Sequence, residues 1–176
     1  MNLIISDQGI VLKKKIIRDN LISLSIFSSS QGKLILSAWG IKKITSRRIS
    51  HLETGNYIKF NYSVGTQFSS LMETELIYAY SKIRSSLDKT KMMYLALFVL
   101  EKILPEDQQE SELFDKTLLF LKKINNQKVN TVLIEDFLID LLITAGFITK
   151  QSTKQPLFDI YKTTENIIGA KIKIVF

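Results

Sequence analysis

The hydrophobic period of the chain changes near residue 85, and this change constrains the fold more than any other feature of the sequence. In residues 1–84, apolar side chains alternate with polar ones, so that Ile22, Leu24 and Ile26, for example, share one face. A period of two is typical of half-buried β-strands. From Ser86 onward, apolar residues recur every three or four positions, which is typical of amphipathic helices. The sequence therefore predicts a β-rich segment followed by a helical one.

Five segments of the first half have the pattern of strands, with a long connection between the third and the fourth. We interpret Asp7-Gln8-Gly9 as a turn before the first strand, and residues 28–32 as the turn of a hairpin. This arrangement favours a small Greek-key barrel of the OB type, which also leaves few open strand edges. The predicted strands are residues 10–14, 20–27, 33–39, 57–62 and 70–80.

The second half is expected to form a small helical domain over residues 85–176. Apolar stripes predict helices that end at Leu104, before Asn125 and at Gly146, and a last helix over residues 158–169. We expect Thr131 to cap the third of these helices. The acidic residues 106–110 are predicted to form a solvated loop, and residues 170–176 an extended tail. The fold class is therefore α+β, with a five-stranded OB-type barrel in residues 1–84 followed by helices.

The composition argues against a catalytic or metal-binding function. The chain has no cysteine and one histidine, His51, which excludes thiol catalysis, cysteine-ligated zinc and histidine-rich metal sites. Glu73 and Glu75 share a strand face but lack a supporting group, and His51 is expected to be an ordinary surface or capping residue. We predict no enzymatic activity, no catalytic residue, no metal and no cofactor.

The sequence also predicts a cytoplasmic location. The longest apolar runs, such as residues 92–100 and 137–147, fall short of the roughly 20 residues that a membrane span needs. The first residues lack the basic segment, long apolar stretch and small-residue cleavage site of an export signal. We therefore expect no contact with a membrane.

The net charge of +7 lies entirely in the first half of the chain. Residues 1–84 carry 12 Lys and Arg against 5 Asp and Glu, whereas residues 85–176 carry 12 against 12. Such asymmetry is typical of a polyanion-binding module attached to a neutral module. The alternative is a solvated surface that happens to be basic.

The basic residues 40–50 are the first candidate for a binding site, because they combine four cations with little apolar content and are expected to form an exposed loop. Cations of the preceding strands could continue a track for a phosphate backbone. The loop as a group favours function, whereas any single lysine could equally be an outward strand position. The candidate nucleic-acid-binding residues are Lys13, Lys14, Lys15, Arg18, Lys33, Trp39, Lys42, Lys43, Arg47 and Arg48.

Three aromatic residues fall on outward positions in the strand alternation. Phe27, Trp39 and Tyr57 could stack on unpaired bases, as aromatic residues do on OB-fold surfaces. The alternative is that they pack in the interior, with the lone tryptophan at the junction between barrel and helices.

An ordered set of short motifs resembles the N-terminal domain of bacterial RecO proteins. The set comprises the GIVLK-type strand of residues 9–13, a strand that ends in Phe27, the turn Gln31-Gly32-Lys33, and a glycine-led basic loop from Gly40. The resemblance continues into the helical half through residues 137–147, which are similar to an F-x-x-x-L-L-x-x-x-G-F segment of the family, and it covers about residues 1–148.

Beyond residue 148, the family has a Cys-x-x-Cys-type zinc-finger segment, and this chain has no cysteine. The zinc site therefore cannot be carried over. Residues 165–173 resemble the closing helix of the family, as in a reduced form that lacks the zinc-finger region.

The resemblance implies a non-catalytic recombination mediator in DNA repair, associated with the nucleoid. Such a protein binds and anneals single-stranded DNA, cooperates with RecR, contacts the acidic tail of single-stranded-DNA-binding protein and helps load RecA. In this chain Lys122, Lys123 and Lys128 could attract the acidic tail, or could simply solvate a helix end. Two other hypotheses stay open: a protein-interaction adaptor that keeps the barrel, and an OB-type RNA-binding protein.

Overall fold

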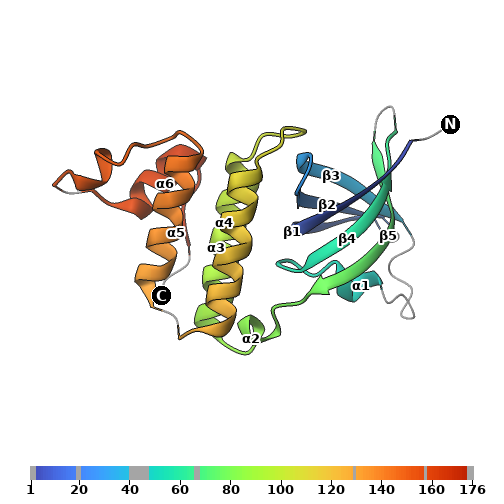
Figure 1. Cartoon of the computed structure of the whole chain (residues 1–176), viewed down its shortest axis with the longest axis horizontal. Helices are drawn as coiled ribbons and strands as arrows, with labels where there is room; N and C mark the ends of the chain where they lie inside the picture. The colour runs from blue at the N-terminus through green and yellow to red at the C-terminus, as the bar shows by residue number, and fades with distance from the viewer. Residues whose placement is uncertain are drawn as a thin grey trace. The chain divides into compact units, whose positions relative to one another are not determined.

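The computed structural model describes residues 3–18, 21–39, 48–65, 68–128, 130–156 and 158–173, apart from the side chains of Arg48 and Ile49. The chain divides into two compact units (Figure 1). One unit comprises Met1–Ala79 together with Leu104–Ser111, and the other comprises Tyr80–Ile103 together with Glu112–Phe176.

The first unit is a closed barrel of five strands in the order β1-β2-β3-β5-β4. All neighbouring strands are antiparallel except β3 and β5, which run parallel where Leu36 and Ser37 meet Ser69 and Ser70. The helix α1 (Arg48–His51) follows β3 in sequence. This strand order is that of the OB fold and confirms the predicted fold class. The strands are β1 (Ile4–Arg18), β2 (Leu21–Ser28), β3 (Gly32–Trp39), β4 (Tyr57–Ser63) and β5 (Ser69–Tyr78).

The inside of the barrel is filled by alternate residues of each strand. The predicted inward set of β2 (Ile22, Leu24 and Ile26) is buried there, which confirms the alternation. Because directly paired residues project to the same face, this set also determines which residues of β1 and β3 point outward. Further members of the core are Val11, Leu34, Leu36, Ala38, Leu52, Ile58, Phe60, Tyr62 and Leu71.

The predicted turn at Asp7-Gln8-Gly9 is wrong, because these residues lie within the long strand β1. The first part of β1 pairs with β4 and the last part with β2, and the two ladders overlap at Gly9 and Ile10. A β-carbon on Gly9 would lie 2.6 Å from Cγ2 of Ile26 and 2.7 Å from the carbonyl oxygen of Phe27. Glycine is therefore needed here for a close approach between strands, not for a turn.

Asp7 organises the turn between β2 and β3. Its carboxylate is buried and accepts hydrogen bonds from the hydroxyls of Ser28, Ser29 (2.9 Å) and Ser30 (2.7 Å), and from the backbone N–H of Gln8 (2.7 Å). These bonds satisfy a buried acid with neutral donors and hold the hairpin turn in one conformation.

The acidic residues 106–110 belong to the barrel unit. Their side chains are mostly exposed, as predicted, but the backbone N–H of Asp107 donates to the carbonyl oxygen of Lys33 at 3.2 Å, beside a parallel bridge between Lys33 and Glu106. This segment therefore pairs with the start of β3. Gly32, with φ of 75°, lies so close to the backbone of Gln108 that a β-carbon would not fit.

The second unit contains the four predicted helices and the short α2 (Ser81–Arg84), which follows β5 and was not predicted. Gly146 ends α5 as predicted: the N–H of Gly146 donates to the carbonyl oxygen of Ile143, and that of Phe147 to Leu142. Among the described residues, the helices are too short or too polar to cross a lipid bilayer. The other helices are α3 (Leu87–Ile103), α4 (Ser111–Asn126), α5 (Thr131–Thr144), the 3₁₀ turn η1 (Ser152–Lys154) and α6 (Ile160–Ile168).

The predicted cap of α5 at Thr131 is wrong by one position. Asn130 is the cap, and its side chain accepts a hydrogen bond from the N–H of Leu133 at 3.2 Å. Residues 170–173, the described part of the predicted tail, have no regular structure. The side chain of Glu165 holds them in place, because it accepts a hydrogen bond from the N–H of Ile172 at 2.7 Å.

Candidate nucleic-acid interface

Most of the candidate residues that the structure describes lie on the outer surface of the strands β1, β2 and β3. Paired residues form rows across the three strands, and three of these rows project outward because the alternate residues of β2 and β3 enter the core. We call this surface the basic face. Its three rows are Lys13–Ser25–Ile35, Lys15–Ser23–Ser37 and Arg18–Leu21–Trp39.

The cations of the basic face are exposed. Within the described part of the chain, the side chains of Lys15 and Arg18 make no ion pair or hydrogen bond. Several lysines elsewhere are paired: Lys116, for example, lies 2.9 Å from Asp140. Unpaired cations on a sheet surface keep their full charge for a ligand, so this face can attract an anion.

Two predicted site residues lie apart from this exposed surface. Lys14 is paired with Leu24 of the inward set and forms an ion pair with Glu53. Lys33 lies at the other end of the outer surface, in the row of Ile10 and Phe27, both fully buried. Its side chain is 12% exposed, with the ammonium 4.0 Å from Glu106. Neither lysine presents a free charge beside Lys15 and Arg18.

Of the three aromatic residues, Trp39 alone has the predicted exposure. It is 61% exposed at the end of β3, in the row of Arg18. The prediction for Phe27 is wrong: its side chain is fully buried, because the outer side of β2 is covered at this end. Tyr57 is half-buried, and its hydroxyl donates a hydrogen bond to Gln8.

The basic loop stays a prediction. Lys42, Lys43 and Arg47 lie outside the described residues, and so does the side chain of Arg48, whose backbone begins α1. The predicted loop therefore gives way to helix over residues 48–50.

Three serines of the basic face were not among the predicted site residues. Ser23 and Ser37 are half-buried and directly opposite each other, and Ser25 is 5% exposed. The hydroxyl oxygen of Ser25 is buried without a hydrogen-bond partner in the described structure. The available signal was the alternation of serine with core residues in Ser23-Leu24-Ser25, which places small polar side chains on an outer sheet surface.

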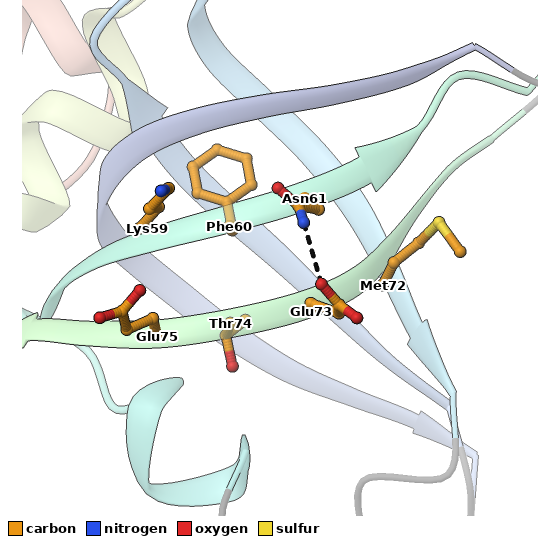
Figure 2. Close-up of a pocket in the computed structure, with 7 residues that line it drawn as sticks. All are labelled: Lys59, Phe60, Asn61, Met72, Glu73, Thr74 and Glu75. Carbon is orange, nitrogen blue, oxygen red and sulfur yellow. Dashed lines mark hydrogen bonds between the residues drawn. The ribbon is translucent and has the colours of Figure 1, made fainter.

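The outer surface of β4 and β5 has the opposite character (Figure 2). A hollow of about 670 Å³ there is lined by Glu73 and Glu75, with Lys59 opposite Glu75 in the ladder and Asn61 donating to Glu73 at 3.0 Å. With two carboxylates against one ammonium, this surface disfavours a polyanion. Within the described ranges, no cluster of three or more potential metal ligands exists here or elsewhere.

A smaller hollow of about 270 Å³ lies between α4 and α5, beside the stacked rings of Phe120 and Phe137. Its charged lining is balanced, with Lys116 and Lys123 against Asp136 and Asp140. The hydrogen bond to Asp140 is the main cause that raises the pKa of Lys116, which therefore stays charged and paired.

The strand order and the basic outer face define a protein of the OB-fold class. Residues 1–80 match the family model described as recombination protein O N terminal. Three curated relatives of this chain are named DNA repair protein RecO. The relative from Dehalococcoides mccartyi is 25% identical to it over 124 residues, that from Syntrophomonas wolfei 25% over 140 residues, and that from Ehrlichia chaffeensis 27% over 131 residues. Residues 1–80 are thus similar to the N-terminal domain of the RecO family, and the similarity to curated RecO proteins extends into the helical half of the chain.

These alignments cover 70%, 80% and 70% of this chain and 49%, 56% and 50% of the respective relatives. The chain thus spans about half the length of the curated relatives that it matches.

Proposed function

We propose that this chain binds single-stranded DNA on the basic face of the barrel and acts in DNA repair and recombination without catalysing a reaction. The observation that carries the proposal is that Lys15 and Arg18, whose side chains have no partner among the described residues, share one outer sheet surface with the exposed Trp39 and with serines. The relatives named DNA repair protein RecO support the biological role.

The physical basis of binding is phosphate neutralisation combined with stacking. Each cation that pairs with a phosphate releases condensed counterions, so affinity falls as salt rises. An exposed indole offers a flat surface to any base that is not already stacked in a duplex. Because stacking requires an unpaired base, the face favours single strands over duplexes.

Annealing follows if the strand is held mainly through its backbone. Lys15 and Arg18 recognise charge rather than base edges, so most base edges stay accessible to a complementary strand. Lys42, Lys43, Arg47 and Arg48 would extend this track.

The proposed partners are RecR, RecA and the acidic tail of single-stranded-DNA-binding protein, all from the family resemblance. For the tail, the hollow between α4 and α5 offers an apolar floor, but its charges are balanced. Lys122, Lys123 and Lys128 would have to supply the attraction.

The test is fluorescence anisotropy with a labelled single strand at several salt concentrations. Wild type should bind tightly at low salt, and K15Q/R18Q should bind more weakly, with a log–log salt slope smaller by about 1.4 because two contacts at about 0.7 each are lost. The matched control is K59Q, which removes an exposed lysine from β4.

Other results would reject the proposal or redirect it. Absence of binding by wild type at low salt would leave the adaptor hypothesis, and stronger binding to RNA of the same sequence would favour RNA handling. Loss of binding in K42E/K43E/R47E, with K15Q/R18Q unchanged, would move the site from the basic face to the loop.

A further inference from the structure

We propose a phosphate-binding site at the centre of the basic face, formed by the hydroxyls of Ser23 and Ser37 with the ammonium of Lys15. The inference rests on the proposed function, because the phosphate belongs to the backbone of the bound strand. It adds which group of the nucleic acid faces the sheet at this point: a phosphate and not a base.

The ladder register brings these three side chains into one row. Lys15 is paired with Ser23, and Ser23 with Ser37. The irregularities of the β1–β2 ladder lie between Val11 and Lys13 and between Ile16 and Arg18, so the row itself is regular. Directly opposite residues have Cβ atoms about 4.5–5.5 Å apart, so two adjacent hydroxyls can donate to different oxygens of one tetrahedral anion.

All three groups lack a partner among the described residues. Lys15 is exposed, Ser23 and Ser37 are half-buried, and none of their side chains makes a hydrogen bond or ion pair there. Serine hydroxyls and lysine ammonium groups are frequent donors to phosphate oxygens in nucleic-acid complexes. The row therefore offers donors and positive charge together.

On β3, the row also has a smaller side chain than its neighbours. Ser37 lies between the longer side chains of Ile35 and Trp39, each two residues away and thus about 6.6–6.8 Å along the strand. Because the side chain of Ser37 is short, a backbone can approach closely while a neighbouring base rests on Trp39. A row of aromatic residues would instead favour bases against the sheet.

Ser25 provides an independent observation. Its side chain is 5% exposed, and its hydroxyl has no hydrogen-bond partner in the described structure. It is adjacent to Ser23 on the same side of β2. Buried polar groups without partners are rare in native proteins and call for a ligand or an ordered water. A phosphate at the serine row, or a water that it orders, would satisfy this hydroxyl.

The experiment compares two labelled strands of equal length, oligo-dT and an abasic strand that keeps the phosphates but has no bases. The variants are S23A/S37A and W39A, and the control is S6A, which removes an exposed serine from β1. Circular dichroism verifies that each variant is folded. For S23A/S37A we expect about a hundredfold weaker binding to both strands, since two hydrogen bonds to a charged group are lost. W39A should weaken binding to oligo-dT alone.

The outcomes separate the site from the proposed function. A loss in S23A/S37A confined to oligo-dT would mean that the serines contact bases, and an unchanged affinity would mean that they contact nothing; both overturn the phosphate site while DNA binding stands. Binding of wild type to oligo-dT but not to the abasic strand would also overturn it. Failure of wild type to bind either strand would overturn the proposed function itself.

Discussion

The carboxylate of Asp7 accepts a hydrogen bond from the hydroxyl of Ser30 at 2.7 Å, across 23 residues of sequence. It also accepts from the hydroxyls of Ser28 and Ser29, so one buried acid holds the whole turn between β2 and β3. This turn connects the two strands that carry the serines of the basic face.

We expect D7A to destabilise the barrel, because three hydroxyls would lose their acceptor and that of Ser28 is buried. The free energy of unfolding should fall by about 2–3 kcal/mol, as measured by urea denaturation. S6A, at an exposed position of the same strand, is the control. A loss below about 0.5 kcal/mol would show that the turn does not depend on the carboxylate.

Substitution of Gly9 should be costly for a steric reason. In G9A the new methyl group would lie 2.6 Å from the side chain of Ile26 and 2.7 Å from the backbone oxygen of Phe27, which cannot rotate away. Overpacking of this kind costs about 1–3 kcal/mol. Urea denaturation of G9A beside S6A measures this cost, and equal midpoints would disprove the close approach of β1 and β2.

Trp39 provides an intrinsic probe because the chain has a single tryptophan. Its fluorescence should be quenched when single-stranded DNA binds, because a base would stack on the exposed ring. The abasic strand should bind with little quenching, and duplex DNA of the same length should quench less than oligo-dT. Saturated binding of oligo-dT without any change in emission would place Trp39 outside the interface.

The cap of α5 can be assigned by two single substitutions. N130A should lower the free energy of unfolding of the helical unit by about 1 kcal/mol, because the N–H of Leu133 loses its acceptor. T131A, one position further, should cost less, since alanine has a high helix propensity. Thermal unfolding followed by circular dichroism at 222 nm compares them; a larger effect of T131A would restore the prediction made from the sequence.

Tyr161 should make the helical unit sensitive to high pH. Burial, together with the nearby carboxylate of Glu135, raises the pKa of Tyr161 from 10.0 to about 12. The neutral phenol is thus favoured in the folded state, whereas the unfolded chain loses this proton at lower pH. Stability should be fully present below pH 10 and fall as the pH rises from about 10 to about 12.

The measurement is the urea midpoint between pH 8 and 11.5 for wild type and Y161F. The variant should lose less stability over this range. Its urea midpoint should still fall somewhat with pH, because burial also raises the pKa of Tyr62. Y94F, at an exposed tyrosine of α3, is the control. Identical slopes for wild type and Y161F would contradict the assignment.

Much of the fold was predictable because hydrophobic alternation is a local property. Ile22, Leu24 and Ile26 showed which face of β2 is buried, and this face then determined the outward direction of Ser23 and Ser25. The helical stripe before Gly146 likewise located α5 and its end. The composition excluded cysteine chemistry, and the charge of residues 1–84 indicated a polyanion.

Part of the candidate site could not be predicted, because it depends on contacts between distant segments. Lys14 and Lys15 are adjacent in sequence, yet one forms an ion pair with Glu53 and the other is unpaired in the described structure. Phe27 has the alternation of an outward residue but is fully buried. Local periodicity reports which side of a strand a residue occupies, not what covers that side.

The sequence by itself determined the succession of five strands and four main helices, the α+β class and the excess of positive charge, because backbone propensity and side-chain period act over a few residues. Only the tertiary structure decided the rows of the basic face, the need for glycine at position 9 and the role of Asp7. Those features depend on ladder register and barrel closure, which join residues far apart in the chain and leave no local pattern.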